Sequence, residues 1–315
     1  MFASLLGSRF WIVGYLSLAA GLWLPGDYGH LEPLIPVVLG TMLFFTSLRV
    51  RLSALAGEIT SLRALRRIAA LSGLKLIALP LAVYALGLLL APEWALGLFL
   101  VAAMPAGMSS AALTGLYGGN IGMALMLILA TSLLCPLTVP LQLQLLGGSP
   151  DWPLAARKAG YLLLLLAIPF ALAQVAWRVA PRFVADRDAL WQRCTLGVMS
   201  ALIFVSAAPC RDAWSHVAGH ALLVPIALTG VASALFVATG LVSRLALATP
   251  EAIAFGCACI YMNNGLGVAF AAKFYPDDAH MLLPAIMMQV PMLGATVLFG
   301  TWMRRRAAVA PAAPA

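Results

Sequence analysis

Two short stretches of the sequence place amides or hydroxyls next to glycine inside otherwise apolar segments. In "YMNNGLGVAF", Asn263 and Asn264 are followed directly by Gly265. In "PAGMSSAALTGLYGGN" (105–120), a proline and a glycine precede two serines. Side-chain oxygens of this kind accept hydrogen bonds from the free N–H groups at the start of a helix. Because such a helix start carries a positive partial charge, both stretches could bind an anion.

We interpret both stretches as interruptions of a helix. Pro105 lacks an N–H donor and disturbs the preceding turn, and Gly107 permits a non-helical turn. Close packing of small residues would explain the glycines, but it does not explain two adjacent amides. The interpretation assigns a binding role to five residues, of which the first four are also expected to cap a helix: Ser109, Ser110, Asn263, Asn264 and Gly265.

Lys75 is the one basic residue that the sequence places deep inside an apolar segment, away from its ends. It lies about ten residues into the segment 65–91, which at about 1.5 Å per residue is near half the depth of a bilayer. A charge at this depth is costly and points to a function, although the long side chain could also reach back to the surface. All 11 Asp and Glu residues fall in predicted loops or at segment ends, so no carboxylate is placed to bind Na⁺ or relay protons.

The elements that must position these residues are membrane-spanning helices. Apolar residues make up 63% of the 315 residues and charged residues 10%, with a mean hydropathy of +0.99. A spanning helix needs about 20 mostly apolar residues. The sequence therefore predicts an all-α polytopic membrane protein. Ten segments meet this condition, namely 10–25, 33–50, 65–91, 93–117, 120–147, 158–180, 189–208, 217–243, 250–272 and 279–303.

The basic residues predict the orientation of these segments. With the N-terminus inside, 14 of the 19 Lys and Arg residues fall on the inside and four on the outside, in agreement with the positive-inside rule. We therefore expect a multi-pass protein with both termini in the cytoplasm. The net charge of +8 follows from this topology, so the expected surroundings are the lipid bilayer and not nucleic acid. Abundant Arg, Ala and Leu with few Lys suggest a bacterium, and hence its inner membrane.

No residues are arranged for catalysis or metal binding. The five cysteines show no metal-type spacing with histidine, and neither a phosphate loop nor a nucleophile arrangement is present. We therefore predict that the protein is not an enzyme, has no catalytic residues, and binds no metal or organic cofactor.

A polar loop at 147–158 divides the chain into two halves of five segments. An odd number per half makes the second half enter the membrane from the opposite side, as in the inverted repeats of transporters. The repeats would cover 10–147 and 158–303 within a single transmembrane domain. The interrupted stretches fall in the fourth segment of each half, which is where transporters place their binding site. Residues 307–315 are expected to be disordered.

Ten spans, the "PAGMSSAALTGLYGGN" stretch, a fifth span ending in "TSLLCPLTVP" and the "NNGLGVAFAA" stretch together resemble the bile acid:sodium symporter family. The similarity covers nearly the whole chain. It implies a panel domain made of spans 1, 2, 6 and 7 and a core domain made of the others, with broken spans four and nine crossing near the midplane. Members of the family carry bile acids, pantoate, keto acids and other organic anions, commonly together with Na⁺.

The sodium-binding positions are where this sequence departs from the family. The first crossover usually reads Ser-Asn, but here it reads Ser110-Ala111. The third-span glutamine that helps to bind sodium aligns with Lys75, whose ammonium group is expected to replace the charge of the ion. Other oxygen-bearing side chains of the family align with Ala124, Ile128, Ala258 and Met262.

These features predict a secondary transporter that moves a small organic anion by alternating access and does not depend on Na⁺. The anion would be of the bile-acid, pantoate or keto-acid type. A buried ammonium group can also release its proton, so coupling to H⁺ is a further possibility. The alternatives are a Na⁺-coupled symporter with a degenerate site and a non-transporting membrane sensor or scaffold. A monomer is expected, and the substrate and the direction of transport stay open.

Overall fold

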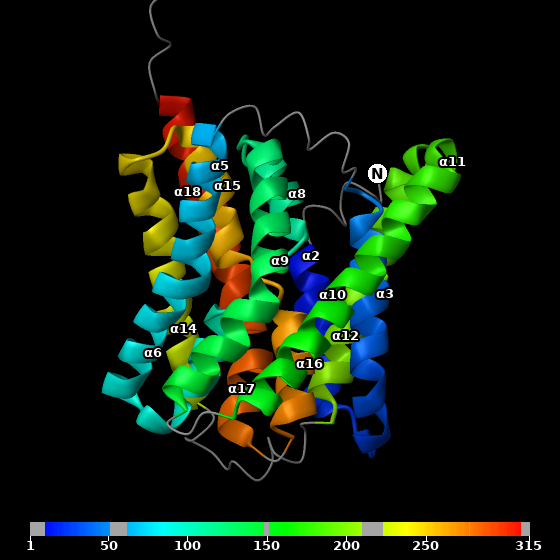
Figure 1. Cartoon of the computed structure of the whole chain (residues 1–315), viewed down its shortest axis with the longest axis vertical. Helices are drawn as coiled ribbons and strands as arrows, with labels where there is room; N and C mark the ends of the chain where they lie inside the picture. Colours follow the sequence, from blue (N-terminus) through cyan, green and yellow to red (C-terminus); the bar gives the residue numbers. More distant parts are fainter. Residues whose placement is uncertain (1–9, 51–61, 148–150, 210–222, 277, 310–315) are drawn as a thin grey trace, which may run out of the picture.

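The chain folds into an all-helical bundle (Figure 1). The computed structural model describes residues 10–50, 62–147, 151–209, 223–276 and 278–309. Within these ranges the regular structure is helical, and one isolated antiparallel β-bridge joins Ala106 to Met262. The prediction of an all-α membrane protein is confirmed at this level.

The first half contains α2 (Phe10–Trp23), α3 (Ile35–Ser47), α5 (Leu62–Gly73), a π-helical turn (Leu74–Ala78), α6 (Leu79–Leu90), α7 (Ala95–Ala102), α8 (Ser109–Leu116) and α9 (Ile121–Leu146). The second half contains α10 (Trp152–Val179), α11 (Pro181–Ala185), α12 (Asp188–Ala207), α14 (Leu223–Val242), α15 (Thr249–Ile260), α16 (Asn264–Phe274), α17 (Ala279–Met287) and α18 (Gln289–Val309). Short 3₁₀ turns occur at Gly29–Leu34, Pro92–Trp94 and Ser243–Leu245.

Helices occupy all ten of the predicted apolar segments, although the start of the segment 217–243 lies outside the described residues. Among the described residues, six helices are long and apolar enough to cross a membrane: Leu62–Leu90, Ile121–Leu146, Trp152–Val179, Asp188–Ala207, Leu223–Leu245 and Ala279–Arg304. The same residues contain four shorter apolar helices, at Ile12–Trp23, Ile35–Ser47, Pro92–Ala102 and Thr249–Ile260.

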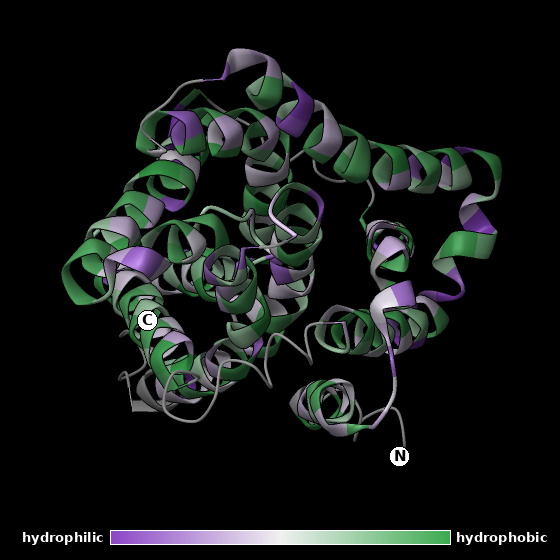
Figure 2. Cartoon of the chain, turned by 90° about the horizontal axis from the view of Figure 1, so that it is seen from below, coloured by the Kyte–Doolittle hydropathy of each residue, from purple (hydrophilic) through white to green (hydrophobic). Residues whose placement is uncertain are grey.

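The helices pack in two groups. In the first group, α12 packs on α2 and α3, and α10 packs on α3 and also on α9; α3, α10 and α12 lie on the right of Figure 1. This first group contains the helices that the family resemblance assigns to the panel. It is tied together by hydrogen bonds from Trp177 Nε1 to the Leu48 carbonyl (2.8 Å) and from Gln174 Nε2 to the Val50 carbonyl (3.0 Å). The second group contains α5–α9 and α14–α18, in which α7 packs on α6 and α17, and α14 packs on α15 and α18. Seen from below, helices with largely apolar surfaces surround the more central ones (Figure 2).

Two expected boundaries differ from the structure. The sixth segment begins at Trp152 and not at 158, because the Asp151 carboxylate accepts from the Leu154 N–H (2.9 Å) and Pro153 occupies the first turn. Lys158 therefore lies within a helix and not in a loop. At the other end of the chain, α18 continues to Val309, so residues 307–309 of the expected disordered tail are helical. The rest of that tail lies outside the described residues.

Candidate functional site

The two interrupted helices meet at their interruptions, where backbone hydrogen bonds join them. The N–H of Gly107, between α7 and α8, donates to the Tyr261 carbonyl (2.8 Å). The N–H of Asn263, between α15 and α16, donates to the Pro105 carbonyl (2.8 Å). These bonds flank the bridge between Ala106 and Met262. Irregular backbone in a membrane must be satisfied by protein groups, and this short antiparallel pairing satisfies it.

Small and polar residues make the crossing possible. A Cβ atom on Gly107 would lie 2.9 Å from Tyr261 Cδ1 and 3.0 Å from the Met262 carbonyl oxygen, so no larger residue fits there. The N–H group of Ala106 donates to the Thr131 hydroxyl of α9 (3.1 Å). Thr131 in turn donates to the Leu127 carbonyl (2.7 Å). The antiparallel pairing at the crossing is therefore also hydrogen-bonded to α9.

The expected capping residues behave differently in the two helices. Asn263 caps α16 as expected, because its Oδ1 accepts from the Leu266 N–H (3.4 Å). The expectation that Ser109 and Ser110 cap α8 is wrong. Both lie inside its first turn, because the Gly107 carbonyl already accepts from the Ser110 N–H (2.9 Å), and no side chain caps this helix.

Asn264 does not cap α16 either. It is the first residue of that helix, and its Nδ2 donates to the Ala285 carbonyl near the end of α17. The expectation failed because Asn264 already lies within the helix, one residue after the N-cap Asn263. The Ala285 carbonyl lies beside an interruption at Met288, between α17 and α18, which the sequence did not indicate. The Oδ1 atom of Asn264 is buried without a hydrogen-bond partner within the structure.

Lys75 is fully buried, with 1% of its surface exposed. Its Nζ donates to the Ala102 and Met104 carbonyls, each at 2.9 Å. These carbonyls lie at the end of α7, where free carbonyls carry a negative partial charge. The alternative that Lys75 reaches back to the surface is therefore wrong, because the first crossover offers it two acceptors inside the protein.

Pro80 explains how Lys75 comes to point inward. A proline has no N–H to donate to the carbonyl four residues earlier, which here belongs to Leu76. Gln142 of α9 donates to that carbonyl instead (2.9 Å). The backbone widens into the π-helical turn that contains Lys75, and turns of this kind occur frequently at functional sites.

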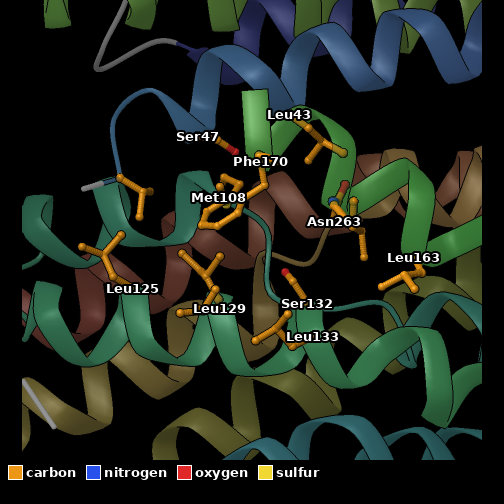
Figure 3. A pocket seen from close by; sticks show the side chains of 15 residues that line it. Leu43, Ser47, Met108, Leu125, Leu129, Ser132, Leu133, Leu163, Phe170 and Asn263 are labelled. Carbon is orange, nitrogen blue, oxygen red and sulfur yellow. The ribbon is translucent and has the colours of Figure 1, made fainter. Parts of the chain in front are cut away.

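A cavity of about 270 Å³ lies between the two groups of helices, against the crossing (Figure 3). Residues of α3, α9 and α10 form its walls, and Met108 and Asn263 belong to the two crossovers. Among the described residues, the polar side chains in its lining are those of Ser47, Ser132 and Asn263, and none of the described lining residues is charged. The remaining lining is apolar: Leu43, Val50, Leu125, Ile128, Leu129, Leu133, Leu163, Leu166, Ala167, Phe170 and Ala171.

A second, smaller cavity of about 40 Å³ touches the crossing as well, and Asn263 lines both. It brings together Ser109, Asn264 and Gly265 with Thr195 of α12. Four of the five predicted binding residues thus meet at the crossing. The fifth, Ser110, is buried away from both cavities and its hydroxyl has no partner within the structure.

Ser47, Ser132 and Thr195 line these cavities but are not among the binding residues predicted from the sequence. Isolated hydroxyls in apolar helices commonly bond to their own backbone, so sequence alone gives no reason to prefer these over others.

The residues at the family's sodium-binding positions do not fit a Na⁺ ion. Ala124, Ile128, Ala258 and Met262 are all at most 3% exposed and offer no side-chain oxygen, whereas hard cations need several oxygen ligands. Within the described part of the chain, no group of three or more His, Cys, Asp or Glu side chains could hold a metal ion.

Comparison with known proteins agrees with this arrangement. A sequence model described as the SBF-like CPA transporter family matches residues 26–305. No curated protein matches the chain.

Proposed function

The chain belongs to the SBF-like CPA transporter family, and from this premise we propose that it carries an amphipathic organic anion without using Na⁺. That it is a multi-pass membrane transporter follows from the family and from its apolar helices. The proposal adds ten spans in two inverted halves, cytoplasmic termini, the bacterial inner membrane and alternating access.

The apolar cavity at the crossing is the observation that carries the proposal. Its walls come almost entirely from Leu, Ile, Val, Met, Phe and Ala side chains. Pockets of this kind bind a ligand mainly through its apolar surface and fix its orientation with a few polar groups. Among the three expected substrate types, a bile-acid-like anion with a bulky apolar body suits this lining better than pantoate or a small keto acid.

Asn263 is the polar group that we assign to the anionic end. Its Oδ1 is engaged by the Leu266 N–H, so Nδ2 is left to donate into the cavity. Asn263 is also the N-cap residue of α16, and Met108 is that of α8, so the positive ends of two helices are close to the same position. Among the described lining residues, the groups that could hold an anion are this donor and the helix dipoles.

The contacts between the two helix groups suit alternating access. The cavity lies between α3 and α10 of the first group and α9 of the second. At the start of α10, which is the end of that helix away from α11, Lys158 donates to the Tyr275 hydroxyl (2.6 Å). Nearby, Tyr161 packs edge-on against Phe274. We propose that these contacts close one end of the transport path and separate when the groups move.

Thermal stabilisation of the purified protein tests the substrate class. A ligand at about 100 times its Kd stabilises the folded state by about 2.7 kcal/mol, which is enough to raise the melting temperature measurably. We expect taurocholate or a steroid sulfate to raise it, and pantoate and pyruvate to raise it less or not at all. A larger rise with pyruvate would contradict the assigned class. No rise with any compound would favour the sensor or scaffold alternative.

Lys75 supports independence from Na⁺. Backbone carbonyls such as those of Ala102 and Met104 are ligands that a sodium ion could use, and here an ammonium group with the same charge binds them. Because the ammonium group is covalently attached to the protein, it balances the negative partial charge of these carbonyls without an ion from solution.

Uptake into proteoliposomes tests this point directly. With the substrate found by thermal stabilisation, we expect equal initial rates when external Na⁺ is replaced by choline. An imposed proton gradient, inside alkaline, tests coupling to H⁺ in the same choline buffer. Uptake that requires Na⁺ would support the alternative of a symporter with a degenerate site and contradict the role of Lys75, while leaving the substrate class intact.

A further inference from the structure

A groove of about 320 Å³ runs between α14 and α18, far from the crossing. Its lining consists of Val237 and Leu241 from α14 and Leu298, Phe299, Thr301 and Trp302 from α18. Thr301 bonds to the Leu298 carbonyl of its own helix (3.0 Å), so the groove presents an almost wholly apolar surface.

Close packing fixes the base of this groove. A Cβ atom on Gly240 of α14 would lie 2.8 Å from the Cα of Gly256 in α15 and 3.1 Å from the Phe299 ring. Phe299 is therefore locked among three helices, with 1% of its surface exposed. The groove is a permanent feature of the packing and does not depend on a flexible side chain.

The groove faces away from the helices that line the transport cavity. In Figure 1, α14 and α18 lie on the opposite side of the molecule from α3 and α10. Leu298 is 69% exposed, and Val242 and Leu245, at the end of α14 and in the turn after it, are 60% and 88% exposed. In a multi-pass membrane protein such large exposed aliphatic side chains face the acyl chains of the bilayer.

A cation lies at one end of the groove. Arg244 follows Leu241 by one turn, and its guanidinium carbon is 5.5 Å from the centre of the Trp302 ring. No carboxylate among the described residues forms an ion pair with Arg244. Tryptophan is enriched at the membrane–water interface, and the positive-inside rule puts Arg244 on the cytoplasmic side.

We propose that this groove binds an anionic phospholipid, with an acyl chain along α14 and α18 and the phosphate on Arg244. The occupant must be both apolar and anionic, and it must reach a surface that faces the bilayer. Basic pockets between transmembrane helices on the cytoplasmic side bind lipid head groups in this way. The inference does not depend on the proposed substrate.

Native mass spectrometry of the purified full-length protein tests the proposal, with phosphatidylglycerol and phosphatidylcholine of equal chain length as probes. We expect tighter binding of phosphatidylglycerol. Arg244→Gln should weaken it roughly fivefold, which corresponds to about 1 kcal/mol for one basic residue near the membrane surface, and should leave phosphatidylcholine unchanged. Leu298→Trp, at an exposed position that tolerates a larger side chain, should fill the groove and weaken both lipids.

Arg187→Gln is the matched control. The Arg187 guanidinium also stacks over a ring, that of Phe183 at 3.8 Å, but away from the groove. This variant should bind both lipids as the wild type does. Equal binding of the two lipids by the wild type, an unchanged preference in Arg244→Gln, or unchanged binding in Leu298→Trp would each overturn the proposal. So would equal competition by glycerol 3-phosphate, because the site would then recognise a soluble anion.

Discussion

Lys75→Gln abolishes transport while the protein still folds. Glutamine keeps an amide N–H that can donate to the Ala102 or Met104 carbonyl, but it removes the charge that binds both carbonyls in the wild type. Two hydrogen bonds to a charged group contribute about 1.5 kcal/mol or more each, so initial uptake rates are expected to fall roughly 100-fold. The melting temperature should change little, because removing a buried charge also removes its desolvation cost.

Two further variants separate the charge from other effects. Lys75→Met has a similar volume but removes both the charge and the donor, and it should also lose transport. Lys273→Met makes the same change at an exposed position on α16 and should transport normally. If Lys75→Gln retained full uptake, the charge of Lys75 would have no role in coupling. Lys75 does not line the cavity, so ligand-induced thermal stabilisation should survive in Lys75→Gln even though transport does not.

Asn263→Asp is expected to abolish substrate binding without unfolding α16. Aspartate caps a helix as well as asparagine does, so the bond from the Leu266 N–H is kept. The Nδ2 donor is lost and a negative charge enters the cavity, where it repels an anion. A hydrogen bond to a charged group contributes about 1.5–3 kcal/mol, so with the added repulsion the Kd should rise roughly 100-fold or more. The measurement is thermal stabilisation by taurocholate, followed by uptake.

Asn120→Asp is the matched control for this change. Asn120 caps α9 by accepting from the Met123 N–H (3.0 Å), and it is exposed and outside both cavities. It should bind and transport as the wild type does. Unchanged affinity in Asn263→Asp would place the anionic end of the substrate elsewhere, and the apolar walls alone would then define the site.

Asn263→Asp and Lys75→Gln should also affect different steps of transport. Asn263 touches the cavity and is expected to act on affinity, whereas Lys75 holds the end of α7 from behind the crossing and is expected to act on the movement of the helices. If Asn263→Asp and Lys75→Gln weakened binding equally, Lys75 would have to contribute to the substrate pocket. The lining of the larger cavity does not include Lys75.

Local composition was enough to locate the interruptions. Pro105 and Gly107 cannot continue an ordinary helix, and Asn263 is a strong capping residue, so these features act through their own backbone and near neighbours. The same is true of Pro80, whose missing N–H leaves the carbonyl four residues earlier without a partner in its own helix. The structure shows that carbonyl, at Leu76, bonded to Gln142.

Capping by Ser109, Ser110 and Asn264 could not be decided locally. Ser110 donates its N–H to Gly107, which starts α8 earlier than the serines suggest. Asn264 is drawn to Ala285, 21 residues away. In both places the residue lies inside the first turn of its helix, and where that helix starts depends on the crossing of the two interrupted helices.

The sequence by itself determined that the chain is a helical membrane protein of a transporter family, interrupted at two places, with a lysine inside an apolar segment. These properties depend on composition, on local backbone chemistry and on motifs. Only the tertiary structure decided that Lys75 binds the end of α7, that Asn263 faces an apolar cavity, and that α14 and α18 leave a groove beside Arg244. Each of these depends on contacts between residues far apart in the chain, and hydrophobic periodicity carries no information about which helices become neighbours.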